Sequence, residues 1–177
     1  MCPAPPGTVV REPFTRRWSN ATQWPNGVLP ADGDTVEVHG NWTVIIDVAL
    51  PVFNQLVVDG VLIADDSRDV NITAKWIHIR AGNLTAGSES SPFLHNFVIQ
   101  LNGNKHDAGY YIDPILAGNK HMVVSGTLNI HGVTPSTVTT YLKQTAMKND
   151  SAIFVNSKSG WAVGDTIVIA PTFSAWN

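Results

Sequence analysis

The residues best suited to chemistry gather in one short stretch in the second half of the chain. There Asn104-Lys105-His106-Asp107 is followed by Tyr110-Tyr111 and Asp113. Lys105 could bind a carboxylate on a sugar, and His106 or Asp107 could donate a proton to a glycosidic oxygen. The alternative is a solvated insertion loop, because long loops in compact domains are polar by default. We favour the loop and retain Lys105, His106, Tyr110 and Tyr111 as candidate ligand-binding residues, with His106 and Asp107 as candidate acid–base groups.

The other polar residues do not form a recognisable metal or cofactor site. Asp65, Asp66 and Asp69 lie close together but lack the loop pattern of a calcium site, so we interpret them as a solvated turn. The histidines show no metal-ligand spacing: His39, His78, His95, His121 and His131. The single cysteine, Cys2, is either a free thiol or a partner for a cysteine outside this chain. We therefore predict no metal and no cofactor.

Five asparagines begin an N-x-[ST] sequon, the acceptor motif for N-linked glycans. They are Asn20, Asn41, Asn71, Asn83 and Asn149. Composition alone gives about two such motifs in a chain of this length, so coincidence in an Asn- and Thr-rich sequence is the alternative. The excess predicts a glycosylated chain that enters the secretory pathway and reaches the cell surface or the extracellular space.

Glycines end apolar stretches at a regular spacing. Gly40, Gly60, Gly82, Gly103 and Gly126 are separated by 20, 22, 21 and 23 residues, and the apolar residues between them alternate or form short runs. A period of about 20 to 25 residues, built from short strands and glycine corners, is typical of a β-solenoid in which each coil stacks on the next. We therefore predict an all-β, single-domain parallel β-helix with about 20–23 residues per coil.

The second residue after each glycine sets the phase of this repeat. It is large and apolar in four cases, namely Trp42, Leu62, Leu84 and Leu128. Because side chains alternate along a strand, we expect these residues to point inward and their neighbours to point outward. The outward neighbours are Asn41, Thr43, Asn83 and Thr85, an arrangement that glycan attachment requires. After Gly103 the same position holds Lys105, so we expect this repeat to carry a loop insertion.

The two ends of the expected solenoid differ. Trp18 and Trp24 precede the alternating strand at 35–38, and we predict that they form a cap over the apolar end of the solenoid. The alternative is that these two tryptophans stack against sugar rings. Near the other terminus, Gly164-Asp165 leads into an apolar strand that includes Ile167–Ile169, with no visible cap, and we expect more coils to follow in the parent protein.

Composition limits the partners and the number of domains. A net charge of −3, with Lys and Arg scattered along the chain, gives no basic surface for nucleic acid. No apolar run approaches the ~20 residues that cross a bilayer, so we expect no membrane insertion by this segment. The 177 residues, 44% of them hydrophobic, suffice for one core. We predict a linker at 1–16, one β-helix domain at 17–173 and the start of a following region at 174–177.

The chain resembles the G-8 (eight-glycine) domain of fibrocystin, fibrocystin-like proteins, transmembrane protein 2 and the hyaluronan-related cell-migration-inducing proteins. The resemblance spans about 17–173 and rests on Trp18-Ser19, Trp24-Pro25, Pro30 with Gly33-Asp34, Ala86-Gly87 before Pro92-Phe93 and Phe97, Gly126 with Leu128 and Gly132, and Trp161 with Gly164-Asp165. The candidate family glycines are Gly27, Gly33, Gly60, Gly82, Gly87, Gly103, Gly126 and Gly132. Residues 27–30 are most similar to the fibrocystin-like branch.

This resemblance implies a large parent glycoprotein at the cell surface or ciliary surface. It implies two alternative functions for the domain. The first is a structural or interaction module that docks neighbouring domains or subunits of the parent, or neighbouring extracellular proteins. The second is binding or depolymerisation of a glycosaminoglycan similar to hyaluronan. Relatives that act on hyaluronan favour Arg just after the glycine, where this chain has Asn104, so we favour the interaction role and no enzymatic activity.

Overall fold

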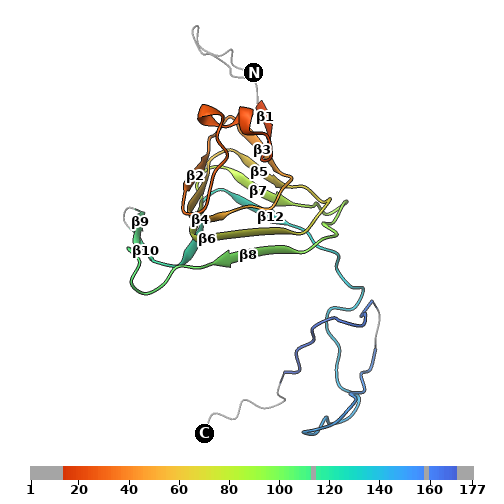
Figure 1. Ribbon diagram of the computed structural model, residues 1–177. Helices are drawn as coiled ribbons and strands as arrows, with labels where there is room; N and C mark the ends of the chain where they lie inside the picture. The colour runs from red at the N-terminus through yellow and green to blue at the C-terminus, as the bar shows by residue number, and fades with distance from the viewer. Residues whose placement is uncertain (1–13, 113–114, 158–159, 171–177) are drawn as a thin grey trace, which may run out of the picture. The chain divides into compact units, whose positions relative to one another are not determined.

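A computed structural model describes residues 14–112, 115–157 and 160–170 of the chain (Figure 1). The chain divides into two compact units, Met1–Val133 and Thr134–Asn177. All the named strands of the described residues lie in the first unit. The all-β class expected from the sequence is therefore confirmed, whereas the expected domain boundaries at 16/17 and 173/174 stay predictions.

The first unit contains short strands and two 3-10 helices. In chain order they are β1 (Phe14–Arg17), η1 (Ala21–Gln23), η2 (Pro25–Gly27), β2 (Thr35–Val38), β3 (Trp42–Ile46), β4 (Val52–Val58), β5 (Val61–Ala64), β6 (Val70–Ile79), β7 (Asn83–Ala86), β8 (Phe97–Leu101), β9 (Tyr110–Ile112), β10 (Ile115–Gly118), β11 (His121–Val124) and β12 (Thr127–Ile130).

Two parallel sheets organise these strands. Sheet A has the order β1-β3-β5-β7-β12, and sheet B has the order β11-β6-β4-β2, with β8 also paired to β6. Within these two sheets, strands of neighbouring repeats pair in parallel, as in the register of β3 with β5 and of β5 with β7. The chain thus alternates between the sheets once in each repeat, and the stacked strands are visible in Figure 1.

Glycines are required at three of the turns that join the sheets. An added Cβ would collide with the His39 carbonyl at Gly60, with the Gly60 carbonyl at Gly82 and with the Gly82 carbonyl at Gly126. The amide of Asn83 donates to the Gly60 carbonyl at 2.8 Å, which holds consecutive turns together. Because each turn lies directly against the previous one, no side chain fits there. The glycine period therefore arises from crowding at these turns.

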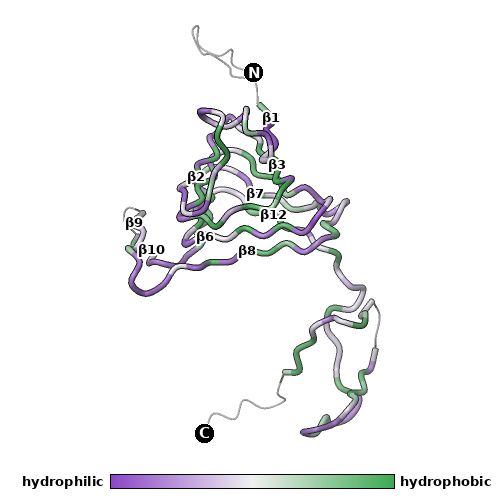
Figure 2. Tube along the Cα trace, in the orientation of Figure 1, coloured by the Kyte–Doolittle hydropathy of each residue, from purple (hydrophilic) through white to green (hydrophobic). Residues whose placement is uncertain are grey.

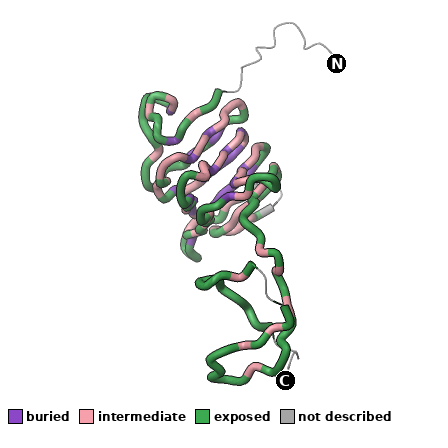
Figure 3. The backbone as a smooth tube through the Cα atoms, turned by 90° about the vertical axis from the view of Figure 1, so that its right-hand side faces the viewer, coloured by how far each residue is buried: buried purple, intermediate pink, exposed green. Residues whose placement is uncertain are grey.

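The core lies between the sheets and follows the predicted alternation. Val44, Leu62 and Leu84 are register partners and are fully buried. Leu128 pairs with Leu84 but is 37% exposed, because β12 is the last strand of sheet A. Burial of each Leu or Val of this kind contributes about 1.5–3 kcal/mol, so the stacked columns stabilise the repeat. Figure 3 shows the buried segments in these strands.

The predicted equivalence of Trp42 with Leu62 is wrong by two residues. Trp42 pairs with Phe14, and Val44 is the residue that pairs with Leu62. Gly40 lies four residues before Val44, whereas Gly60 lies two residues before Leu62, so the first turn is longer. Trp42 still packs against the core, half-buried.

The fourth repeat contains the insertion that the sequence predicted, but Gly103 is not one of the stacked glycines. Along β6 the core positions change from even numbers up to Ala74 to odd numbers from Ile77, and Trp76 and His78 are buried outside the core cluster. Its first half pairs with β8 and its second half with β11. Residues 102–120 leave the repeat between these two strands and include the antiparallel β9–β10 hairpin. Gly103 approaches Asn119 within this insertion, and Gly126 stacks on Gly82.

The tryptophans before β2 are buried. Trp18 and Trp24 are 1% and 6% exposed, their ring centroids are 4.7 Å apart, and the Trp24 indole donates to the Trp18 carbonyl at 3.0 Å. Their burial supports the predicted cap and contradicts the alternative that these two rings offer a surface for sugars.

The second unit has little regular structure in its described residues. An isolated antiparallel bridge joins Leu142 to Val155, and Asp165 accepts a hydrogen bond from the Ala162 amide at 2.7 Å. None of these residues is buried (Figure 3). The expected strand at Ile167–Ile169 is absent from the described residues, since an isolated strand lacks the ladder hydrogen bonds that stabilise it.

Candidate functional site

The predicted polar cluster forms a hydrogen-bonded turn at the start of the insertion. The Asp107 carboxylate accepts from the Asn104 amide and from its side chain, both at 2.8 Å, and from Lys75 Nζ at 3.1 Å. The Asn104 amide, followed by Lys75, lowers the pKa of Asp107. Asp107 is therefore held ionised, the opposite of what a general acid requires. Lys105 and His106 are exposed on this turn, and Figure 2 shows the hydrophilic character of the insertion.

The two predicted tyrosines have different positions. The Tyr110 ring stacks on Trp76, with centroids 3.8 Å apart, and lies nearly parallel to His121, with centroids 5.5 Å apart. Tyr111 is 61% exposed. The structure thus brings Tyr110 against sheet B, where it covers the outer side of β6 and holds the insertion there.

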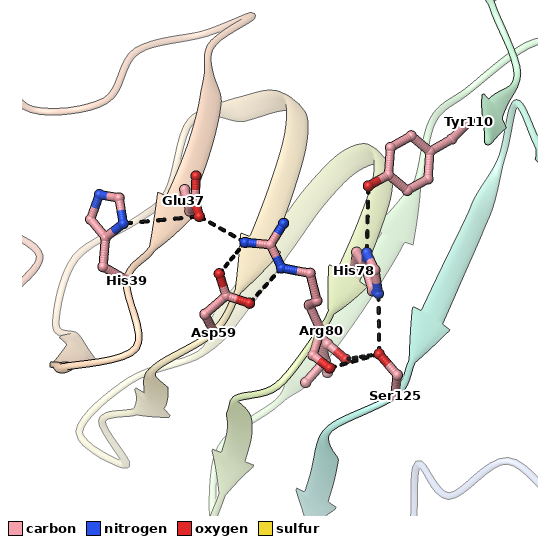
Figure 4. A network of polar contacts seen from close by, with 8 residues as sticks. Glu37, His39, Asp59, His78, Arg80, Tyr110 and Ser125 are labelled. Carbon is pink, nitrogen blue, oxygen red and sulfur yellow. Dashed lines mark hydrogen bonds and ion pairs between the residues drawn. The ribbon is translucent and has the colours of Figure 1, made fainter. Parts of the chain in front are cut away.

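A chain of polar contacts continues from Tyr110 across sheet B (Figure 4). The Tyr110 hydroxyl lies 3.5 Å from His78 Nδ1, and His78 Nε2 lies 3.2 Å from Ser125 Oγ. Ser125 donates its hydroxyl proton to the Arg80 carbonyl at 2.7 Å, so it can only accept from His78. This places the imidazole proton on Nε2. Burial lowers the pKa of His78, which favours this neutral form.

The geometry of the Tyr110–His78–Ser125 contacts does not match that of a nucleophile and its base. In such a pair the hydroxyl donates to the imidazole, whereas here His78 donates to Ser125. The contacts therefore connect β6, the residue after β11 and the insertion, and they hold these segments together.

A network of ion pairs lies beside these polar contacts on the same face of sheet B (Figure 4). The Arg80 guanidinium binds Asp59 through two nitrogens, with Nε 2.7 Å from Oδ1, and its Nη2 lies 2.9 Å from Glu37 Oε1. His39 Nδ1 lies 3.9 Å from the same Glu37 oxygen. The Arg80 hydrogen bond lowers the pKa of Asp59. The Arg80 guanidinium thus links residues of three successive repeats, because Glu37, Asp59 and Arg80 each belong to a different one.

The sequons differ in exposure. Asn20, Asn71 and Asn149 are exposed, whereas Asn41 and Asn83 are half-buried. In three of the five the sequon threonine donates to the asparagine side-chain oxygen, at 2.8 Å for Asn20, 3.3 Å for Asn71 and 3.1 Å for Asn83. Asn83 and Thr85 alternate with the buried Leu84 and Ala86. Glycan attachment at these positions stays a prediction.

Sequence reasoning missed the aromatic and imidazole groups that hold the insertion. Trp76 and His121 are far apart in the chain but are register partners on neighbouring strands. One signal pointed to them, since they lie six residues before Gly82 and five before Gly126. Tyr110 could not be placed from that period because it belongs to the insertion.

The part of the chain that the structure describes contains neither a metal-binding cluster nor a membrane-spanning helix. No group of three or more His, Cys, Asp or Glu side chains in this part is arranged to hold a metal ion. No helix in the same part is long and apolar enough to cross a membrane.

Comparison with known proteins identifies the class of this all-β domain with stacked glycine turns. A family model described as "G8 domain" matches residues 23–143, more than half of the chain. The chain belongs to the G8-domain family, as the sequence resemblance predicted.

The relatives are fibrocystins. The chain is 30% identical over 160 residues to human "Fibrocystin-L" and 33% identical over 159 residues to mouse "Fibrocystin". These matches cover 90% and 88% of this chain but about 4% of each relative. The chain therefore spans a small part of the length of the proteins it resembles. No solved structure matches it.

Proposed function

We propose that this chain is an extracellular, glycosylated interaction module of a much larger protein, and that its stacked repeats form a β-solenoid whose last coil docks the next domain. The observation that carries this proposal is the difference between the two ends of the core. Trp18 and Trp24 cover the first end, whereas Leu128 and Ile130 on the last strand are 37% and 43% exposed.

The last strand also has unused backbone groups. The Thr127 amide donates to the Gly82 carbonyl and the His131 amide to the Ala86 carbonyl, each at 2.9 Å. In a parallel strand the N–H and C=O of one residue point to the same side, and successive residues alternate. Leu128 and Ile130 therefore direct their amides and carbonyls away from β7, and a further strand can pair there.

Three features support the extracellular and cell-surface location. The chain contains five sequons, it belongs to the G8-domain family, and its relatives are fibrocystins. Expression through the secretory pathway of cultured cells, followed by removal of N-glycans, should lower the apparent mass. An unmodified secreted chain would contradict the glycosylated form of the proposal.

Docking at the open end is tested by hydrogen exchange on two lengths of the parent protein. In this chain the Leu128 and Ile130 amides should exchange rapidly, because no strand of the described residues lies on their side of β12 to accept their hydrogen bonds. In a longer fragment that continues past Asn177 they should be protected, by about a hundredfold if pairing is stable. Equal, rapid exchange in both fragments would show that the end does not dock the following region.

A polysaccharide-binding role is the second candidate, since the hydrogen-bonded turn at Asn104–Asp107 presents Lys105 and His106 to solvent. Incubation of the intact parent with fluorescent hyaluronan, followed by size analysis, separates cleavage from its absence, and calorimetry measures binding alone. A Lys105→Ala substitution should weaken binding if this turn is the site. Unchanged polymer length together with no heat of binding would remove this candidate.

A further inference from the structure

The first strand of sheet B is an uncovered edge. In sheet A, β1 lies beside β3, but no strand of the described residues lies beside β2 on the side opposite β4. The Val38 carbonyl accepts from the Asp59 amide and the Asp34 carbonyl from the Asn54 amide, each at 2.9 Å. Even-numbered residues of this segment therefore face β4. By the alternation of a parallel strand, Thr35 directs its amide and carbonyl to the open side, and so does Glu37 two residues later.

A groove of about 380 Å³ is bordered by this strand. It is lined by residues of the segment before β2, among them Val28 and Leu29, and by residues 34–37, His39 and Trp42. Val28 and Leu29 in this groove are 66% and 37% exposed. We call it the β2 groove. A free strand edge beside a partly apolar groove is the arrangement to which an extended peptide adds as a further strand.

The charges of the β2 groove select among the possible occupants. Asp34 and Glu37 place two carboxylates along it, and the Glu37 side chain is 44% exposed. Arg80 contacts only one oxygen of Glu37 among the described contacts, so the other can accept a further donor. A second copy of β2 in this position would bring two Glu37 carboxylates together, which opposes pairing. A basic side chain is favoured instead.

We propose that the β2 groove binds an extended segment of a protein partner in which apolar and basic residues alternate, and that this segment adds to sheet B beside β2. Its backbone pairs with Thr35 and Glu37, its apolar side chains contact Leu29 and Trp42, and its basic side chains contact Asp34 and Glu37. This surface lies at the opposite end of sheet B from β11 and does not depend on docking at β12.

Hydrogen exchange of the full chain tests whether the edge is available. The amides of Val36 and Val38 should be protected, whereas those of Thr35 and Glu37 should exchange rapidly. Protection of Thr35 and Glu37 in the isolated chain would show that the chain covers its own edge. Protection that rises with protein concentration would show that a second copy does so. Either result would overturn the proposal.

A synthetic peptide tests the binding directly. The probe is a blocked eight-residue peptide in which valine and lysine alternate, titrated into the full chain while the amide signals of Thr35 and Glu37 are followed by NMR. Binding should slow exchange of these two amides, and a peptide with N-methylated alternate amides should bind about tenfold more weakly. No binding, or equal binding of the methylated peptide, would contradict strand addition.

Two substitutions locate the contact on this chain. Thr35→Pro removes one amide that faces the groove without removing a hydrogen bond to β4, and the first position of a strand tolerates proline. It should weaken binding of the valine–lysine peptide about fivefold. Glu37→Gln should weaken it to a similar extent and reduce its salt dependence, whereas Glu89→Gln, on the exposed loop after β7, should not. Equal effects of the two glutamate substitutions would place the peptide elsewhere.

Discussion

At the scale of single residues, Arg80 shows how one side chain joins separate repeats. It binds Asp59 from the previous repeat and Glu37 from the one before, all on the outer side of sheet B. The contact is half-exposed, since the Arg80 side chain is 50% accessible, so solvent screening limits its contribution. Its effect on stability is expected to be small and dependent on pH.

Replacement of Arg80 by Gln tests this contribution. The Arg80 hydrogen bond holds the pKa of Asp59 below its unfolded value of about 3.9. The stabilisation is therefore complete above about pH 4 and disappears as pH falls through the lower, folded-state pKa. We expect the substitution to reduce the free energy of unfolding by about 1 kcal/mol or less at pH 7, and by less near pH 2.5. Urea unfolding at both pH values measures the difference.

Arg68→Gln is the matched control, because Arg68 donates to the Asp47 carbonyl and not to a carboxylate. Its effect should be the same at both pH values. A constant effect of Arg80→Gln across this range would mean that the pair with Asp59 does not contribute.

Gly82 tests the crowding that produces the glycine period. A Cβ at Gly82 meets the backbone of Gly60, which belongs to a neighbouring turn and cannot move independently. We expect Gly82→Ala to lower the free energy of unfolding by about 3 kcal/mol. Gly132→Ala places a Cβ in open space and should change stability by no more than about 0.5 kcal/mol. Thermal or urea unfolding compares them, and equal effects would refute the crowding explanation.

At the scale of elements, the insertion between β8 and β11 is attached to β6 by the stack of Tyr110 on Trp76 and by the Lys75–Asp107 ion pair. Tyr110 stacks on Trp76 and bonds to His78, whereas Lys105 and His106 remain exposed at its start. The insertion should therefore open locally when this ring is removed, while the sheets remain folded.

Limited proteolysis measures this opening. Tyr110→Ala removes a stacking contribution of up to about 1.5 kcal/mol, so trypsin should cut at Lys105 about tenfold faster. Tyr110→Phe keeps the ring and loses only the long hydrogen bond to His78, so its cleavage rate should stay near that of the natural chain. If Tyr110→Phe were cleaved as fast as Tyr110→Ala, the hydrogen bond to His78, and not the aromatic stack, would hold the insertion closed.

The sequence predicted the repeat because its cause is local and recurs. Gly60, Gly82 and Gly126 meet the same obstacle, so the same residue type appears at each turn. Gly103 fits the spacing but belongs to the insertion, and only Lys105, two residues later, departs from the pattern of the other repeats. The contact of Tyr110 with Trp76 depends on how the insertion folds back, which the spacing of residues does not encode.

The candidate site was predicted less well for a related reason. Residue types at 104–111 suggested acid–base chemistry, but the role of Asp107 depends on Lys75 and Asn104, one of which lies in a different repeat. Its carboxylate stabilises a turn. Exposure of Lys105 and His106 agrees with the loop interpretation that the polar composition favoured.

At the scale of the whole molecule, stacked repeats contact mainly their neighbours, so stability varies along the stack. Trp18 and Trp24 are buried in the cap, whereas β12 has one edge that no strand of the described residues covers. The central strands β4 to β7 have partners on both sides. The order of local opening should follow this difference in neighbours.

Hydrogen exchange resolved by strand tests that order, together with one substitution at the capped end. In the natural chain, amides bonded within β4–β6 should be most protected, and those between β12 and β7 least, because the last strand can separate without disturbing the others. Trp24→Ala removes a ring that is 6% exposed and should cost about 3–5 kcal/mol. Leu128→Ala, at a partly exposed position, should cost less and affect β12 alone. If exchange were uniform along the stack, or if Trp24→Ala left β2 and β3 as protected as before, the repeats would unfold as a single cooperative unit and the cap would not control the first end.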